Sequence, residues 1–219
     1  MTPGPVLSAA PRLHGPPRAR WTLLLTHGAG AGTASDFFVA LSRRVLEGGA
    51  QAGGVRLALF DFPFMRVRQR SAARPPPDRM PALRRAYLDA MAALAVDPER
   101  LVIGGKSMGG RVASLIADGA GVAGLVCLGY PFHPRGRPEM LRTAHLEHIA
   151  VPTLICQGTR DPLGHRAEVE GYRLSCSIRF EWLPDGDHDL TPRKRSGHTR
   201  CANLDAAAAA ILRFMESLR

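Results

Sequence analysis

The chain has 219 residues, a length that favours a single domain with a substantial core. Hydrophobic residues at 45% and charged residues at 22% are typical of a soluble globular protein, and no apolar run is long enough to cross a bilayer. The formal net charge is +10, but the basic residues are mostly Arg spread along the chain. Because only Arg193-Lys194-Arg195 forms a compact cluster, we expect a solvated basic surface and no nucleic-acid interface.

The N-terminal residues 1–20 are rich in Pro, Gly and Arg and lack the apolar segment of a secretory signal. They are predicted to form a flexible lead-in to a single domain over 21–219. The cysteines are scattered without a C-x-x-C pair, and Cys127 and Cys156 lie in apolar, strand-like runs. Buried, reduced thiols of this kind fit a cytoplasmic protein better than a disulfide scaffold.

Apolar runs and helical periodicity alternate along the chain. The runs predict strands at 21–26, 55–60, 101–103, 125–128, 153–156 and 177–183. Helical spacing predicts a helix capped by Thr33 or Ser35 and ending near residue 47, and others at 81–95, 112–117, 138–148, 167–172 and from Asn203 to Leu218. The Arg- and Pro-rich segment 66–79 is predicted to be a loop. This alternation indicates an α/β protein, a mostly parallel twisted sheet with helices on both faces.

The segment Gly105-Lys-Ser107-Met-Gly109 lies between the strand at 101–103 and the helix at 112–117. In that setting the G-x-S-x-G pattern places a serine hydroxyl at the tip of a sharp, strained turn, where it can act as a nucleophile. Side chains at 105 and 109 would collide with the neighbouring strand and helix, which explains the two glycines. The pentapeptide also occurs by chance in Gly-rich loops, so catalysis further requires partner groups.

Such partners follow other predicted strands. In an open parallel sheet, ligand groups gather beyond the carboxyl ends of the strands. The chain order Ser107, Asp161, His188 is the order expected for an α/β-hydrolase. His188 would be the general base and Asp161 would orient its imidazole. The backbone N–H groups of Met108 and Ala29 would form the oxyanion hole.

Other residues could take these roles. The alternative bases are His198 and His165, and the alternative acids flank the favoured base in sequence: Asp185, Asp187 and Asp189. Asp187 and Asp189 together with His188 could in principle bind a metal ion, but no second set of residues in the sequence has metal-ligand spacing. We therefore predict no metal and no cofactor. His27 is predicted to shape the oxyanion turn and not to transfer protons.

Several segments carry specific motifs: His27-Gly-Ala-Gly30, Phe60-Asp-Phe-Pro-Phe64, Arg74-Pro-Pro-Pro-Asp78, Gly104-Gly-Lys-Ser-Met-Gly-Gly-Arg111, Gly158-Thr-Arg-Asp161 and Gly186-Asp-His-Asp-Leu190 with Pro192-Arg-Lys194. From Trp21 onward the chain resembles the KANL3/Tex30-type α/β-hydrolase-like family, which is related to dienelactone hydrolases. The resemblance implies an α/β-hydrolase fold and the triad Ser107, Asp161 and His188. It implies little about the substrate, since some members look like scaffolding parts of chromatin complexes.

The sequence thus predicts a serine hydrolase that cleaves a small ester or thioester through an acyl-enzyme on Ser107. Little sequence between Tyr130 and Val151 can build a lid, so we expect a minimal lid or none and an open, shallow site. The loop after Phe64 could lie at its mouth and favour anionic acyl groups through Arg66, Arg68 and Arg70. The alternatives are acyl transfer to an acceptor other than water and a non-catalytic protein that binds an acidic partner. We expect no membrane partner, and the sequence does not indicate the oligomeric state.

Overall fold

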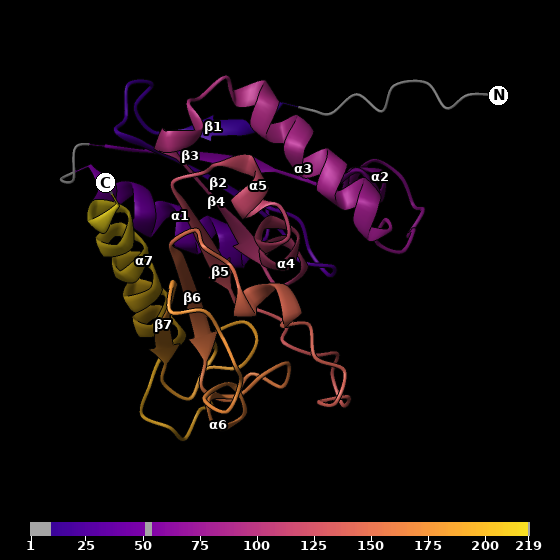
Figure 1. Cartoon of the computed structure of the whole chain (residues 1–219), viewed down its shortest axis with the longest axis vertical. Coiled ribbons are helices and arrows are strands. Elements are labelled where there is room, and N and C mark those ends of the chain that lie inside the picture. Colours follow the sequence, from indigo (N-terminus) through magenta and orange to yellow (C-terminus); the bar gives the residue numbers. More distant parts are fainter. Residues whose placement is uncertain (1–9, 51–53, 219) are drawn as a thin grey trace.

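The computed structural model describes residues 10–50 and 54–218, and these residues form a seven-stranded sheet flanked by helices (Figure 1). The strands, in chain order, are Arg12–His14 (β1), Trp21–Thr26 (β2), Val55–Phe60 (β3), Leu101–Lys106 (β4), Gly124–Leu128 (β5), Thr153–Gly158 (β6) and Ile178–Leu183 (β7). The α-helices are Asp36–Gly49 (α1), Pro63–Arg70 (α2), Met80–Leu94 (α3), Met108–Ser114 (α4), Ala117–Ala120 (α5), Arg166–Val169 (α6) and Arg200–Ser217 (α7). Short 3₁₀ turns cover Pro98–Arg100 (η1) and Ala144–Glu147 (η2).

The sheet has the strand order β1-β3-β2-β4-β5-β6-β7, and only β1 is antiparallel to its neighbour. After β2 the chain adds β3 on one side and β4 on the other. Such a reversal opens a crevice between the carboxyl ends of the two central strands, which are here β2 and β4. The predicted mostly parallel α/β sheet is confirmed.

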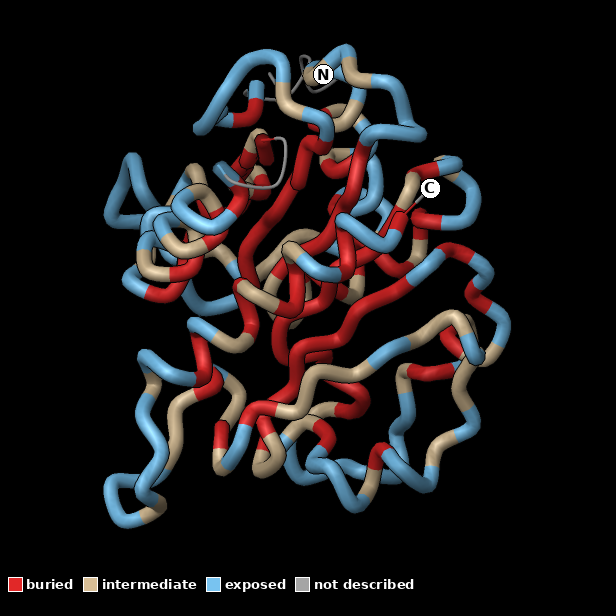
Figure 2. Tube along the Cα trace, turned by 90° about the vertical axis from the view of Figure 1, so that its left-hand side faces the viewer, coloured by how far each residue is buried: buried red, intermediate tan, exposed pale blue. Residues whose placement is uncertain are grey.

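Apolar side chains fill both faces of the sheet. Figure 2 shows that the residues of the central strands are buried. On β2, Leu23 and Leu25 belong to the core under α1 and α7, whereas Leu24 belongs to the core under α2 to α6. A parallel strand buried on both faces is a continuous apolar run, which is why Trp21–Thr26 shows no alternation in sequence. Buried strands of this kind form a rigid base for the loops at their carboxyl ends.

A buried tyrosine ties the central strands together just before the serine turn. The Tyr87 hydroxyl of α3 donates to the carbonyl of Gly104 at 2.7 Å and accepts from the N–H of the same residue at 2.8 Å. Burial raises the pKa of Tyr87, so the phenol stays neutral. This contact fixes β4 next to α3 at the residue where β4 approaches its end.

The segment 66–79, which was predicted to be a loop, differs from the structure at its start. Residues 63–70 form α2, so the predicted loop begins only after Arg70. Pro63 starts the helix. Phe64 and Met65 are buried, Arg66 and Arg68 are half-buried, and Arg70 is exposed. The apolar residues therefore lie at the start of the helix, just outside the segment that was assigned to a loop.

The excursion after β5 contains less helix than expected. The predicted helix at 138–148 is reduced to the single turn η2, because Met140 and Leu141 are exposed and supply no buried face. The predicted helix at 167–172 is the short α6, which ends before Tyr172. The serine helix is also interrupted, with α4 ending at Ser114 before α5 begins.

The chain ends differ as well. Arg12–His14 within the predicted lead-in forms the edge strand β1, while residues 1–9 and 219 lie outside the described residues. The last helix begins at Arg200 with Thr199 as its cap, and Asn203 is not the cap but a buried residue inside the helix. The predicted cap at Ser35 makes no side-chain capping bond. Across residues 10–50 and 54–218, no helix has both the length and the apolar character to cross a membrane.

Both cysteines that were expected to be buried, Cys127 and Cys156, are buried and carry free thiols. Burial raises the pKa of each thiol, so neither is a reactive thiolate. The other two, Cys176 and Cys201, are exposed and free. A cytoplasmic location stays a prediction.

Candidate active site

The turn between β4 and α4 holds its serine in a strained conformation. Ser107 has φ 52° and ψ −116°, a region that a non-glycine residue occupies only when its surroundings impose it. Its N–H donates to the carbonyl of Leu128 at 2.9 Å, and its carbonyl accepts from the N–H of Arg111 at 3.0 Å. These two bonds fix the backbone, so the hydroxyl projects from the tip of the turn.

The motif glycines are explained by close backbone contacts. A Cβ atom on Gly105 would lie 2.5 Å from the carbonyl oxygen of Thr26, and one on Gly109 would lie 2.7 Å from the same oxygen. A Cβ on Gly28, in the turn after β2, would approach the Cβ of Ser107 to 3.2 Å. The collision expected for side chains at 105 and 109 is therefore confirmed. The close approach at Gly28 shows that the turn after β2 packs directly against Ser107.

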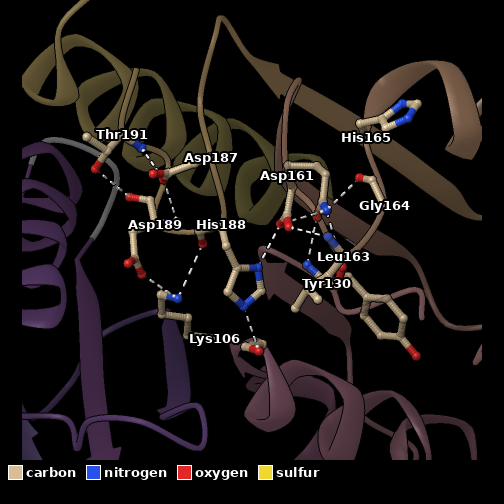
Figure 3. A network of polar contacts seen from close by, with 12 residues as sticks. Lys106, Tyr130, Asp161, Leu163, Gly164, His165, Asp187, His188, Asp189 and Thr191 are labelled. Atoms are coloured by element: carbon tan, nitrogen blue, oxygen red, sulfur yellow. Dashed lines mark hydrogen bonds and ion pairs between the residues drawn. The ribbon is translucent and has the colours of Figure 1, made fainter. Parts of the chain in front are cut away.

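The structure brings Ser107, His188 and Asp161 together from three different strand ends (Figure 3). The Nε2 atom of His188 lies 2.8 Å from Oγ of Ser107, and its Nδ1 atom lies 2.8 Å from Oδ2 of Asp161. The Asp161 side chain is fully buried, whereas that of His188 is 24% exposed. One imidazole thus connects a buried carboxylate with a hydroxyl at the edge of a cleft.

The carboxylate of Asp161 is held by further donors. Oδ2 accepts from Nε2 of Gln157 at 3.0 Å, and Oδ1 accepts from the N–H of Leu163 at 2.9 Å. Gln157 also accepts from the N–H of Tyr130 at 2.7 Å, which ties the ends of β5 and β6 together. Sequence reasoning missed this glutamine, although a Gln inside an apolar strand is an unusual residue that could have indicated it.

A glycine at the end of β5 makes room for the imidazole. Gly129 has φ +62°, and a Cβ there would lie 2.9 Å from the carbonyl oxygen and 3.3 Å from the Nδ1 atom of His188. It would also lie 3.5 Å from Oδ2 of Asp161. Gly129 therefore sets how closely β5 can approach the His188–Asp161 pair, a role that the sequence did not reveal.

A lysine inside the serine motif holds the histidine loop. The Nζ atom of Lys106 donates to the carbonyl of His188 at 3.3 Å and lies 2.7 Å from Oδ1 of Asp189. Its side chain is only 13% exposed and lies over the ring of Phe37, 5.3 Å from the centroid. Burial opposes ionisation of Asp189, but the hydrogen bond and charge of Lys106 outweigh it and lower the pKa of that carboxyl.

The other end of the same loop is held by α7. The Nδ2 atom of Asn203 donates to the carbonyls of Leu190 at 2.8 Å and Pro184 at 3.1 Å. Asp187 closes the loop from inside, because its Oδ1 accepts from the N–H of Asp189 at 2.9 Å and of Thr191 at 3.0 Å. The loop that carries the imidazole is thus held by both β4 and α7.

The alternative acids and bases have other partners. Asp185 pairs with Arg160 at 2.8 Å and with Arg193, whose hydrogen bond lowers the pKa of Asp185 against the opposing effect of desolvation. His165 accepts from the N–H of Glu168 as the cap of α6. His198 lies in an exposed loop. Within residues 10–50 and 54–218, no group of three or more His, Cys, Asp or Glu side chains is arranged to hold a metal ion.

His27 lies under the turn after β2 and is fully buried. Its Nδ1–H donates to the carbonyl of Gly28 at 2.6 Å, and its Nε2 accepts from the N–H of Phe62 at 3.0 Å. This tautomer is neutral. Burial lowers the pKa of His27, although the bond to Gly28 and the charge of Asp61 oppose the shift. Because the carbonyl of Gly28 belongs to the same peptide as the N–H of Ala29, His27 fixes the direction of that N–H.

Two more side chains hold this turn. Oδ1 of Asp61 accepts from the N–H of Thr33 at 2.7 Å and from its hydroxyl at 2.9 Å. Burial opposes ionisation of Asp61, but the bonds from Thr33 lower its pKa overall. Arg68 of α2 donates to the carbonyl of Ala29 at 2.9 Å. Asp61 was noted in the motif Phe60-Asp-Phe-Pro-Phe64 but was assigned no role, although it stands directly after a buried strand.

A cleft of about 750 Å³ opens above Ser107. Its walls include Gly28, Ala29, Phe37, Ser107, His188 and Arg200. The cations that line it are Lys106 and Arg200, not the expected arginines of the 66–79 segment. Arg68 lies beside the turn, but it donates to the backbone carbonyls of Ala29 and Pro75 and thereby stabilises the turn.

The sequence model of the alpha/beta hydrolase domain family matches residues 19–216. The chain belongs to the alpha/beta hydrolase family. The expected α/β-hydrolase fold is therefore confirmed, while the finer resemblance to the KANL3/Tex30 type stays a prediction.

Solved structures of similar proteins agree with this family. The alpha/beta hydrolase described here is similar to a dienelactone hydrolase from Anabaena variabilis, with 25% identity, a TM-score of 0.65, and coverage of 94% of this chain and 93% of that chain. It is also similar in fold to the esterase domain of a Rhodothermus marinus protein, with 14% identity, a TM-score of 0.64, and coverage of 95% and 92%. A third similar fold is XC6422 from Xanthomonas campestris, described as a serine hydrolase without a lid, with 17% identity, a TM-score of 0.55, and coverage of 81% and 80%.

Proposed function

We propose that this alpha/beta hydrolase is a serine hydrolase that cleaves a small ester or thioester through an acyl-enzyme on Ser107. The observation that supports the proposal is a single imidazole, that of His188, 2.8 Å from both Oγ of Ser107 and Oδ2 of Asp161. The similarity of the chain to a dienelactone hydrolase also supports hydrolase chemistry.

In the first half-reaction, Oγ of Ser107 attacks the carbonyl carbon and its proton passes to Nε2 of His188. Asp161 accepts the Nδ1–H bond, which keeps Nε2 free to take the proton and stabilises the imidazolium that forms. The tetrahedral intermediate then collapses. His188 returns the proton to the leaving alcohol or thiol, and the acyl group stays on Ser107.

The second half-reaction uses the same groups with water as the nucleophile. Water gives a proton to Nε2 of His188 as its oxygen attacks the acyl carbon. Collapse of this intermediate breaks the bond to Oγ of Ser107, which takes the proton back from His188. The products are a carboxylic acid and the free enzyme.

Charge on the carbonyl oxygen would be stabilised by the N–H groups of Met108 and Ala29. Met108 is the first residue of α4, where N–H groups have no partner within the helix. The N–H of Ala29 is oriented by the bond from His27 to the carbonyl of Gly28. Neither N–H donates to another backbone group in the described part of the chain. Each donor of this kind contributes about 3 kcal/mol to barrier lowering.

The test is covalent labelling by a fluorophosphonate probe, followed by intact-mass and peptide analysis. We expect one adduct on Ser107 that is absent in Ser107→Ala. Ser114→Ala is the matched control, because Ser114 ends the same helix and also lies 2.8 Å from a histidine nitrogen. A panel of p-nitrophenyl esters and acyl thioesters of increasing length then defines the substrate class, with short acyl groups expected to react fastest in a cleft of about 750 Å³.

Folded wild-type protein that neither reacts with the probe nor hydrolyses any member of the panel would overturn the proposal. That result would favour the non-catalytic alternative, a protein that binds an acidic partner through its basic surface. Acyl transfer is separated from hydrolysis by adding alcohol or amine acceptors and identifying the acylated product.

A further inference from the structure

The sheet ends in two different edge strands. At one end, β1 is three residues long, all of them exposed, and the side chain of Arg12 is bound to Asp61 and Thr33. At the other end, β7 is six residues long and pairs only with β6 among the described residues (Figure 1). A short edge with charged side chains resists pairing with another chain, whereas a longer edge with apolar side chains favours it.

The backbone groups that β7 turns away from the sheet can be identified from its contacts with β6. The carbonyl of Ser177 accepts from the N–H of Thr153 at 3.0 Å, and that of Leu183 accepts from the residue that follows β6 at 3.1 Å. Because neighbouring residues of a strand point their backbone groups to opposite sides, those of Phe180 and Trp182 point away from β6. Neither of these two N–H groups has a backbone acceptor in the described loops and turns.

The side chains of β7 follow an order that is symmetric about the middle of the strand. Around Phe180 the order is apolar, positive, aromatic, negative, apolar, in the segment Ile178-Arg-Phe-Glu-Trp182. The apolar side chains are half-buried on one face of the sheet, and Arg179 and Glu181 alternate with them on the other face. A strand with this order is complementary to a second copy of itself that runs in the opposite direction.

Only one antiparallel register of two β7 strands brings opposite charges together. With Phe180 opposite Phe180 of the second copy, each Arg179 faces a Glu181, and each Ile178 faces a Trp182. The next register in either direction that keeps the outward backbone groups paired places Arg179 opposite Arg179, or Glu181 opposite Glu181. Like charges directly opposite each other are unfavourable, so the charges of the strand select one register.

The same register also pairs the outward backbone groups. Phe180 of each copy can donate its N–H to the carbonyl of the other, and the N–H of Trp182 can donate to the carbonyl of Ile178. The N–H of Ile178 already donates to the carbonyl of Ser175 at 3.1 Å and needs no partner. The charged pairs then lie between the hydrogen-bonded pairs, where side chains of opposite strands approach most closely.

Both charged side chains are accessible to a second copy. Arg179 is exposed, and no ion pair among the described residues includes it. Oε2 of Glu181 lies 3.3 Å from Nη2 of Arg213 in α7, and the Glu181 side chain is still 31% exposed. Because a carboxylate has two acceptor oxygens, Glu181 can keep Arg213 and bind a second guanidinium.

We propose that two copies of this chain associate through their β7 strands, related by a two-fold axis at Phe180, to form one continuous sheet. The interface is isologous, so the same strand serves on both copies and no third copy can add to it. The rings of Phe180 and Trp182, stacked with centroids 4.9 Å apart, form an apolar row across the junction, and the charged pairs lie on the opposite face. The association does not depend on the proposed hydrolase activity.

Two charge-reversal variants test both the surface and its register. Arg179→Glu makes both charges of the strand negative and Glu181→Arg makes both positive, so each variant alone should be monomeric. Mixed in equal amounts, the two variants should form a heterodimer, because each strand then meets opposite charge at both positions. Sedimentation velocity over a concentration series, at constant ionic strength, measures the masses. Arg173→Glu is the matched control, since Arg173 is an exposed arginine outside β7, and it should dimerise as the wild type does.

A second measurement follows the interface through Trp182. The chain has two tryptophans, and Trp21 is 4% exposed, so a change of emission with protein concentration reports on Trp182. Emission should shift to shorter wavelengths as the wild type is concentrated and as the two variants are mixed, but not in either variant alone. Near-ultraviolet circular dichroism verifies that both variants are folded. A wild type that stays monomeric, a dimer that persists in both single variants, or a mixture that stays monomeric would overturn the proposal.

Discussion

Two serine–histidine pairs flank α4, and both have an oxygen–nitrogen distance of 2.8 Å. In the pair Ser107–His188, the imidazole donates to the buried carboxylate of Asp161, and the serine backbone has φ 52°. In the pair Ser114–His145, the serine proton is donated to the carbonyl of Arg111, and Nδ1 of the imidazole has no carboxylate partner among the described residues. The two pairs have the same oxygen–nitrogen distance. They differ in the partner of the imidazole Nδ1 and in the acceptor that the serine hydroxyl faces.

The difference shows that a short serine–histidine contact does not identify an active site. An imidazole acts as a base toward serine only if Nε2 is free to accept, which requires the proton to be held on Nδ1. Asp161 imposes that tautomer on His188, whereas no carboxylate among the described residues does so for His145, and the hydroxyl of Ser114 faces the Arg111 carbonyl as a second acceptor. The assignment of function therefore depends on the third group.

The largest expected effect separates the two histidines. His188→Gln should lower kcat for ester hydrolysis by about 10⁶-fold, because it removes the base. His145→Gln should leave kcat within about threefold of the wild type. Initial rates with a p-nitrophenyl ester measure both, and equal losses in the two variants would contradict the comparison.

Asp161→Asn should make the pair Ser107–His188 resemble the pair Ser114–His145, in which no carboxylate orients the imidazole. The amide can no longer hold the proton on Nδ1 of His188, so kcat should fall by about 10⁴-fold with little change in KM. The downfield proton resonance of the imidazole Nδ1–H should disappear at the same time. Retained activity would show that another group orients the imidazole.

Gly129→Ala tests how tightly the catalytic pair is packed. The new Cβ would lie 2.9 Å from the carbonyl oxygen of His188, and the displacement should reduce the labelling rate by about 10²-fold. Gly136→Ala is the matched control, because Gly136 has φ +71° but nothing within 4 Å of a Cβ. Both variants should lose about 1 kcal/mol of stability from strain, so an equal loss of labelling would refute the packing role.

Lys106→Met should have a smaller effect through the loop that carries His188. Losing its bonds to the His188 carbonyl and to Asp189 should lower kcat about tenfold without raising KM. Lys106→Arg should restore part of the rate. Lys194→Met, the exposed lysine of the same chain, is the control and should behave as the wild type.

The smallest effect concerns stability and pH. Burial and the charge of Arg111 lower the pKa of His145 from 6.5, so the folded protein binds this proton less readily than the unfolded chain. The resulting stability is present above about pH 6.5 and is lost as the pH falls through the lowered pKa. His145→Gln should flatten the fall in unfolding free energy between about pH 7.5 and about pH 5. An unchanged slope would contradict this.

The sequence predicted the parts of the molecule that depend on local patterns. Apolar runs located the parallel strands, and the glycines of the serine turn indicated the sharp bend that the backbone of Ser107 adopts. The chain order of serine, acid and histidine led to the same three side chains that the structure brings within hydrogen-bond distance. Each of these signals depends only on neighbouring residues or on strand order.

The supporting contacts could not be predicted because they join residues distant in sequence. Asn203 looked like a helix cap, yet its amide binds loop carbonyls that only the folded sheet brings near. Nothing in the local sequence indicates the contacts of Lys106 or Gly129 with the loop that carries His188. The arginines of the 66–79 segment were misplaced because the helix that orients them begins earlier, at Pro63.

The amide of Asn203 also affects the stage of synthesis at which the proposed active site can form. Ser107 and Asp161 precede α7 in the chain, but the loop that carries the imidazole is held in place by a side chain inside that last helix. During synthesis, the proposed nucleophile Ser107 and Asp161 therefore leave the ribosome before α7 can hold the proposed base in line with them. A nascent chain that stops short of α7 can form most of the sheet and still lack a properly held proton acceptor.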